Sequence, residues 1–166
     1  MSSQNSSDKT LYEEEQPTQR WVMIVSWVGT CLGAIVTLAT FFIPGIPLFI
    51  PVVSIAGLLF VLLSVWNFRR LQIRATTKGI TFGFGIFRWR VLWSDIVRVS
   101  ARPYIFLRFL GWGIRLDLRG TIGFIARSSM GVQLETPRLK YFISTNNPQA
   151  ICDLAHRFIV HDSERV

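Results

Sequence analysis

The sequence predicts a membrane α-helical hairpin followed by a mainly-β domain, which a C-terminal amphipathic helix caps. Three observations lead to this prediction. The 46 residues from Trp21 to Trp66 include no Asp, Glu, Lys, Arg or His. After Arg70 the apolar residues recur with a period of two, which is typical of half-buried strands. From Pro148 to about Val160 they recur at helical spacing and form one apolar stripe.

The composition excludes several classes of protein. Half of the residues are hydrophobic and only 17% are charged, with a mean hydropathy of +0.38. This is too apolar for an ordinary soluble domain, and it also excludes a disordered chain, a coiled coil and a collagen. The two cysteines, Cys31 and Cys152, lie in the apolar stretch and near the C-terminus, so a disulfide-rich secreted framework is excluded as well.

Charge divides the chain into an acidic tail, a neutral middle and a basic domain. Residues 1–20 have a net charge of −2 and are expected to form a disordered tail. Residues 21–68 are expected to form the hairpin, residues 69–161 the β domain and residues 162–166 a short tail. Because 69–166 carry 16 basic and 6 acidic side chains, a domain beside a bilayer would attract anionic headgroups, by roughly 1 kcal/mol for each Lys or Arg near the surface.

The apolar stretch is long enough for two spans, since about 20 helical residues cross a hydrocarbon core. Pro44, Gly45 and Pro47 predict a helix break at its centre, because proline removes a backbone donor and glycine loosens the chain. The spans are therefore placed at 21–42 and 47–68. A re-entrant hairpin that does not cross the bilayer is the competing interpretation.

Basic residues predict the orientation of the hairpin. The turn has none, whereas four follow the second span: Arg69, Arg70, Arg74 and Lys78. By the positive-inside rule, both termini are expected in the cytoplasm, in a multi-pass protein of the cell inner (plasma) membrane. A cleaved signal peptide is not expected, because the leading segment is acidic and the apolar run is too long.

Gly29 and Gly33 form a G-x-x-x-G pattern, which allows helices to approach closely in lipid. Three interpretations remain open. The pattern is the face of a homodimer, or the contact between the two helices of one hairpin, which requires no further partner, or a chance match in a span that tolerates glycine.

Seven short antiparallel strands are predicted after the hairpin, on the alternation of apolar and polar residues. They are expected at 71–76, 80–84, 87–93, 97–101, 114–119, 131–135 and 140–144. Asn147 and Pro148 then give a helix-start signal, a capping residue followed by proline in the first turn. Seven strands and one closing helix describe a barrel or a bent sheet.

Four motifs in this order, after a two-span hairpin, resemble the membrane-anchored bacterial pleckstrin-homology-like proteins. They are LWSDI at 92–96, GWGIR at 111–115, GVQLE at 131–135 and ISTNNP at 143–148. The resemblance covers roughly residues 15–160 and implies two near-orthogonal antiparallel sheets capped by the C-terminal helix. It departs from the family pattern at residues 136–139, where TPRL replaces the usual Asp-Gly turn. The family implies no assigned activity for most of its members.

Few residues suggest catalysis or a cofactor. The sequence has no P-loop, dinucleotide-binding fingerprint or G-x-S-x-G motif. Cys152 and His156 lie four residues apart on the predicted helix and could supply half of a metal site, but no second pair of ligands accompanies them. Asp117 and Glu135 could meet in the fold, although nearby arginines favour structural ion pairs. We expect no enzyme, no metal and no cofactor.

The first candidate binding feature is a set of arginines on the predicted polar faces of the strands. An arginine binds phosphate through a two-pronged fork, so a cluster of them could bind anionic lipid headgroups. The set comprises Arg74, Arg88, Arg90, Arg98, Arg115 and Arg119. The alternative is a solvated sheet face, which needs charge in any case.

The second candidate is the nearly apolar segment 104–112. It contains Phe106, Phe109 and Trp112 together with Arg108, whose long side chain can reach out to water. The segment is either a loop that dips into the membrane or binds a partner, or an ordinary buried strand. Periodicity does not distinguish these for a short apolar run.

The sequence thus predicts a non-enzymatic module, integral to the lipid bilayer, that binds a protein partner or anionic lipid at the cytoplasmic face. It could serve there as a subunit of a membrane complex. The alternative is an enzyme or enzyme accessory acting on a lipid substrate, which needs a nucleophile, base or metal cluster. Nucleic acid is not an expected partner, because no recognised binding motif accompanies the basic charge.

Overall fold

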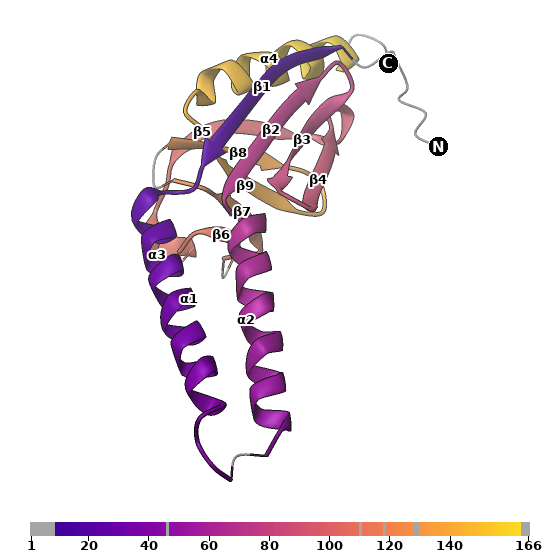
Figure 1. Cartoon of the computed structure of the whole chain (residues 1–166). Helices are drawn as coiled ribbons and strands as arrows, with labels where there is room; N and C mark the ends of the chain where they lie inside the picture. The colour runs from indigo at the N-terminus through magenta and orange to yellow at the C-terminus, as the bar shows by residue number, and fades with distance from the viewer. Residues whose placement is uncertain (1–8, 46, 110, 118, 128–129, 164–166) are drawn as a thin grey trace, which may run out of the picture.

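The computed structural model describes residues 9–45, 47–109, 111–117, 119–127 and 130–163. Within them, the chain forms a helical hairpin and a β domain at one end of it (Figure 1). The hairpin consists of α1 (Arg20–Thr40) and α2 (Phe49–Asn67). Both helices are long and apolar enough to cross a membrane, and little of either is buried. Since the core helix of a soluble protein would be mostly buried, they are two candidate membrane spans.

The break between the helices lies where the prolines and glycine predict it. Helix α1 ends at Thr40, α2 begins at Phe49, and Gly45 between them has a φ of +86°. A Cβ added at Gly33 would lie 3.8 Å from Cδ1 of Leu58 in α2. A Cβ added at Gly29 would have no neighbour within 4 Å. One glycine of the G-x-x-x-G pattern therefore faces the other helix of the hairpin, and the homo-oligomer remains a prediction.

The β domain contains two sheets and three short or terminal helices. Sheet A has the order β1 (Thr10–Pro17), β2 (Arg70–Thr76), β3 (Gly79–Phe84), β4 (Phe87–Leu92). Sheet B has the order β5 (Arg98–Pro103), β8 (Met130–Glu135), β9 (Lys140–Ser144), β7 (Thr121–Ile125), β6 (Gly113–Leu116). The helical segments are η1 (Trp93–Asp95), α3 (Phe106–Phe109) and α4 (Pro148–Ser163). Helix α4 lies across the side of the domain that points away from the hairpin (Figure 1).

The predicted fold class is confirmed: a helical hairpin precedes a mainly-β domain, and a C-terminal helix caps it. Each of the seven predicted strands is present, with ends that differ by at most a few residues. Two strands were not predicted, β1 and β7. The expectation of antiparallel pairing throughout was wrong at one place, because β7 pairs with β9 in parallel.

Residues 10–17 form β1 and do not belong to a disordered tail, contrary to expectation. The strand pairs antiparallel with β2, which places Glu13 opposite Arg74. Its alternate residues point inward, and Gln16 is fully buried. Glu14 accepts hydrogen bonds from the Thr145 hydroxyl and the Asn146 N–H (2.9 Å), just after β9. Charge pairing on one face and these bonds on the other explain why an acidic segment is ordered.

The core lies between the two sheets and under α4. The alternating apolar residues of β2 and β3 face the inner residues of β8 and β9, and the rings of Phe82 and Phe124 meet edge to face at 4.9 Å. Ile151, Cys152 and Ala155 of α4 close this core on the side away from the hairpin. The core thus leaves the outer faces of both sheets and the hairpin side of the domain as surfaces for binding.

Candidate functional site

The predicted binding residues do not form one site, because the fold distributes them over three surfaces. Arg74, Arg88 and Arg90 lie on the outer face of sheet A. Arg98 and Arg119 are exposed at sheet B, the first at the start of β5 and the second after β6. The remaining residues, Phe106, Phe109, Trp112 and Arg115, lie in or near α3 and β6, on the hairpin side. The backbone of Arg108 belongs to α3, but its side chain lies outside the described part of the structure.

The outer face of sheet A is a polar groove of about 910 Å³ in which basic and acidic side chains alternate. Arg70 contacts Glu15 at 2.9 Å, and Arg74 lies 3.9 Å from Glu13. All four side chains of these pairs are largely exposed to solvent. Exposed pairs of this kind contribute only about 0–1 kcal/mol each to the stability of the fold. Their main effect is to orient the side chains on this face.

Arg88 is held by neighbours in the same sheet. Its Nη2 donates to Oε1 of Gln72 (2.8 Å) and its Nε donates to the Gly85 carbonyl (3.1 Å). Gly83 lies between Gln72 and Arg88 in the register, and a Cβ there would lie 2.0 Å from the Phe87 carbonyl oxygen. These contacts support the solvated-face interpretation for the arginines of sheet A.

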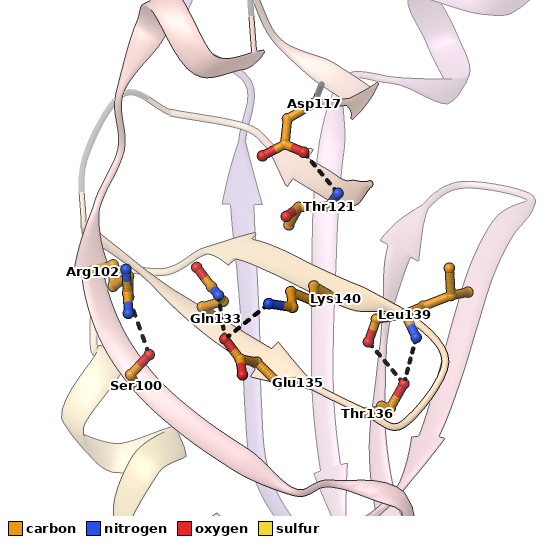
Figure 2. A network of polar contacts seen from close by, with 9 residues as sticks. All are labelled: Ser100, Arg102, Asp117, Thr121, Gln133, Glu135, Thr136, Leu139 and Lys140. Carbon is orange, nitrogen blue, oxygen red and sulfur yellow. Dashed lines mark hydrogen bonds and ion pairs between the residues drawn. The ribbon is translucent and has the colours of Figure 1, made fainter. Parts of the chain in front are cut away.

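The outer face of sheet B carries a second polar network (Figure 2). Glu135 accepts a hydrogen bond from Nε2 of Gln133 (2.8 Å) and lies 3.8 Å from Nζ of Lys140. Asp117, in contrast, accepts bonds from the backbone N–H groups of Arg119 (2.7 Å) and Thr121 (2.8 Å). The two carboxylates therefore have separate partners, and Asp117 shapes the turn between β6 and β7.

The turn at residues 136–139 is fixed by local hydrogen bonds. Thr136 closes the β8–β9 connection: its backbone N–H and its hydroxyl both donate to the Leu139 carbonyl, at 2.9 and 2.8 Å. The Leu139 N–H donates in return to the Thr136 hydroxyl at 3.1 Å (Figure 2). A threonine side chain thus supplies the bonds that fix this turn.

Segment 104–112 has one buried and one exposed side. Phe109 is 3% exposed and packs on Phe142, with ring centroids 5.2 Å apart. Ile105 and Phe106, by contrast, are 54% and 48% exposed. The buried-strand interpretation was wrong, because residues 106–109 form the short helix α3 and the described residues of the segment include no strand. Its exposed side keeps the membrane-dipping interpretation open.

Helix α3 lies beside the start of α1. The rings of Trp112 and Trp21 meet edge to face at 4.5 Å, and Phe106 lies 5.5 Å from Trp112. Thr18, just before α1, donates its hydroxyl to the Phe68 carbonyl (2.6 Å) and its N–H to the Arg69 carbonyl (3.0 Å). The start of α1 is thereby tied to the end of α2.

The turn between β3 and β4 lies at the end of α2. The Ile86 N–H donates to Oδ1 of Asn67 (2.9 Å), and Phe87 stacks on Phe68 at 5.9 Å. Ile86 is 83% exposed, more than any other large apolar side chain in the described chain. The sequence interpretation did not select this turn, although an isoleucine and a phenylalanine directly after Gly85 were a readable signal of an apolar tip.

Exposed apolar residues from four segments thus surround the domain-side ends of the two helices. We call them the apolar rim: Trp21, Trp66, Ile86, Phe87, Ile105 and Phe106. Arg69 lies over the ring of Trp66, 4.7 Å from its centroid. An apolar body with a cation above it is the arrangement found where protein meets lipid headgroups.

A cavity of about 250 Å³, the junction pocket, opens where α1, α2 and β6 meet. It is lined by Thr18, Val22, Phe68, Trp112, Gly113, Ile114 and Arg115. The Nε of Arg115 donates to the Trp112 carbonyl at 3.1 Å, which fixes the guanidinium beside the pocket. The Trp112 Nε1 is buried and has no hydrogen-bond partner within the described residues.

Cys152 and His156 lie in different surroundings despite their helical spacing. Cys152 is buried in the core, and this burial is the main cause of the raised pKa of its thiol. The nearby charge of Asp153 raises that pKa further. His156 is exposed. Among the described residues, no three His, Cys, Asp or Glu side chains are grouped so that they could hold a metal ion.

No family model matches this chain, no curated protein matches it, and no solved structure matches it. The resemblance to the pleckstrin-homology-like proteins therefore remains a prediction from the sequence motifs.

Proposed function

We propose that this chain is a non-enzymatic, membrane-anchored module whose β domain rests on the cytoplasmic surface of the bilayer and contacts anionic lipid headgroups there. Both termini are then cytoplasmic, and the turn around Gly45 is outside. The observation that carries the proposal is the apolar rim. Its six side chains come from separate parts of the sequence and gather at the one level where the hairpin enters the domain.

Exposure of the apolar rim to water is unfavourable. Contiguous exposed apolar surface marks a site of contact with protein or membrane. Burial in the headgroup boundary gains roughly 25 cal/mol for each Å² of apolar surface removed from water. Since α1 and α2 hold the rim at their own ends, contact with the interface requires no further movement of the domain.

Basic side chains accompany the rim. Arg20 precedes Trp21, and Arg69 follows α2. Each cation near an anionic surface adds roughly 1 kcal/mol of attraction, which falls off within a Debye length. The arginines on the outer face of sheet A have acidic and amide partners, so the rim arginines are the better candidates for headgroup contact.

We also propose that the β domain is a pleckstrin-homology-like domain with an added N-terminal strand. Two sheets around one core and a C-terminal helix support this assignment. Strand β1 and the parallel β7–β9 pair depart from the expected pattern.

Spin-labelled lipids test the headgroup contact. The full chain is reconstituted in phosphatidylcholine bilayers with a trace of spin-labelled phosphatidylglycerol or phosphatidylcholine. We expect a larger motionally restricted fraction for phosphatidylglycerol, and the difference should shrink as salt is added. The double variant Arg20→Gln/Arg69→Gln should reduce it, and Arg157→Gln on α4 should not. Equal fractions for both lipids at low salt would remove headgroup binding from the proposal.

A protein partner is the second candidate, because β4 is an unpaired edge strand of sheet A. Trp89 and Leu92 on it are partly exposed, and an edge of this kind can pair with a strand of another chain. A photo-cross-linking residue at position 92, in intact membranes, should then give one adduct of defined mass, whereas position 157 should give none. Identical patterns at the two positions would count against the edge as a docking site.

A further inference from the structure

We propose that the junction pocket binds one anionic phospholipid, with the lipid phosphate at Arg115 and Trp112 and an acyl chain directed along α1 and α2. The inference rests on the proposed function, because a lipid reaches this pocket only if the domain lies on the bilayer. It adds to the proposed function a site for one lipid per chain, with the residues that line it and the class of lipid that it binds.

The position of the pocket makes lipid its nearest ligand. Val22 is in the first turn of α1, and Phe68 directly follows α2, so two of the walls belong to the candidate spans. Ile114 of β6 and the Trp112 ring supply further apolar surface from the domain. A cavity between the ends of two spans and a surface domain opens toward the boundary of headgroups and acyl chains.

Two polar groups of the pocket suit a phosphate. Arg115 is exposed, and the bond from its Nε to the Trp112 carbonyl orients the guanidinium plane in advance. A guanidinium binds the oxygens of a phosphate in a bidentate manner. The buried Trp112 Nε1 has no acceptor in the described chain, and a buried donor without an acceptor is costly. Because that nitrogen is buried, a lipid oxygen in the pocket would reach it only after a small rotation of the Trp112 ring toward the pocket, and would then supply the acceptor.

The walls of the pocket are fixed before a ligand arrives. The Thr18 hydroxyl and N–H both bond to the end of α2, and the Gln19 N–H donates to the Ala126 carbonyl at 3.0 Å. Preformed walls reduce the ordering cost of binding. The volume of about 250 Å³ corresponds to roughly eight waters at ~30 Å³ each, which fits a glycerophosphate group but not a whole lipid. The acyl chains therefore remain outside, along the exposed apolar surfaces of the helices.

Native mass spectrometry of the full chain in a nonionic detergent tests this site. We expect one phosphatidylglycerol per chain, at concentrations at which phosphatidylcholine binds at least about tenfold more weakly. Arg115→Glu should weaken phosphatidylglycerol binding by at least about tenfold, as expected for the loss of hydrogen bonds to a charged group. Arg157→Glu, which makes the same charge change on α4, should leave binding unchanged.

Trp112→Phe provides a second test, because its effects on thermal stability without lipid and on stabilisation by lipid should differ. It keeps an aromatic ring against Trp21 and removes the N–H that has no acceptor. Without lipid, its thermal stability in detergent should equal or exceed that of the native chain. With phosphatidylglycerol, the added stabilisation should be smaller than for the native chain. A variant that loses stability equally with and without lipid would show that the N–H meets no ligand.

Three results would overturn the lipid site. They are equal binding of phosphatidylglycerol and phosphatidylcholine, equal losses in Arg115→Glu and Arg157→Glu, and displacement of the lipid by millimolar sn-glycerol 3-phosphate, which would assign the pocket to a soluble phosphate ester. These failures are separate from that of the proposed function. The apolar rim can lie in the headgroup region while the junction pocket holds no lipid.

Discussion

At the scale of single residues, Glu14 has the densest set of polar contacts in β1. Its carboxylate accepts hydrogen bonds from the hydroxyl of Tyr12 (2.6 Å), from Nε2 of Gln16 (2.7 Å) and from Thr145 and Asn146 beyond β9. Burial by itself would raise the pKa of Glu14, but these bonds outweigh burial and lower it. Burial and the bond to Glu14 raise the pKa of Tyr12 to about 12. Glu14 thus fastens β1 to sheet B as a carboxylate.

We expect Glu14→Gln to destabilise the domain by about 1–3 kcal/mol, because an amide has one acceptor oxygen where the carboxylate has two. Thermal unfolding of the purified full chain measures this. Glu13→Gln is the matched control, since Glu13 makes only an exposed contact at 3.9 Å and should change stability by less than about 0.5 kcal/mol. Equal effects of the two substitutions would contradict the role of Glu14.

The lowered pKa of Glu14 also predicts a pH dependence. A carboxyl group whose pKa is lower in the folded state contributes stability that is complete above its ordinary value of 4.5 and is lost as the pH falls through the folded pKa. The native chain should therefore lose stability on acidification below about pH 4.5. The same titration of Glu14→Gln should be flatter. Parallel curves for the two proteins would rule out Glu14 as the group responsible.

Gly123 is the residue that allows α3 to lie on sheet B. A Cβ at this position would come within 2.7 Å of Cδ1 of Phe109. We expect Gly123→Ala to displace the Phe109 ring and to cost about 1–3 kcal/mol through overpacking. Adding Phe109→Leu should restore part of that loss in thermal unfolding. If Phe109→Leu adds its own cost in full, the two residues do not compete for the same space.

At the scale of elements, the sequence predicts what alternation can reveal. β2 alternates clearly, since one of its faces meets the core and the other meets solvent. β7 has no such pattern. It lies between β9 and β6, its inner side reaches the core, and Phe109 covers its other side. Its residues are therefore almost all buried, and a short buried run carries no period.

β1 was missed for a different reason. Three successive glutamates indicate a solvated tail until their partners are known, and the partners lie on β2, beyond the whole apolar hairpin. The candidate site shows the same limit. Alternation places Arg74, Arg88 and Arg90 on the outer face of sheet A, whereas Arg119 lies in the turn after β6 and not on the predicted strand. Only the fold shows that sheets A and B present their outer faces in different directions.

The pairing of β1 predicts that residues 69–166 alone are an incomplete domain. A chain without residues 1–17 loses the strand next to β2, exposes that edge and leaves Arg70 and Arg74 without their acidic partners. We expect a lower unfolding temperature and more aggregation than for a chain without residues 1–9, in which β1 keeps its whole length. Equal behaviour of the two truncations would show that β1 adds no stability.

At the scale of the whole molecule, the hairpin and the β domain are joined at the domain-side ends of α1 and α2. Asn67 bonds the β3–β4 turn, Trp21 holds Trp112, and Thr18 ties the two helices together. The apolar rim is therefore fixed by the hairpin and would enter the headgroup region whenever the hairpin spans the bilayer. The attachment of the β domain to the ends of the hairpin then determines both the orientation of the domain and its contact with lipid.

The depth of the rim in a bilayer tests this central claim most directly. Single cysteines at positions 86, 105 and 157, in a chain with Cys31→Ser and Cys152→Ala, would carry an environment-sensitive fluorophore in nanodiscs containing doxyl-labelled lipids. The account predicts blue-shifted, quenched emission at 86 and 105 and water-like, unquenched emission at 157. Water-like emission at all three positions would contradict it, because the β domain would then stand clear of the membrane.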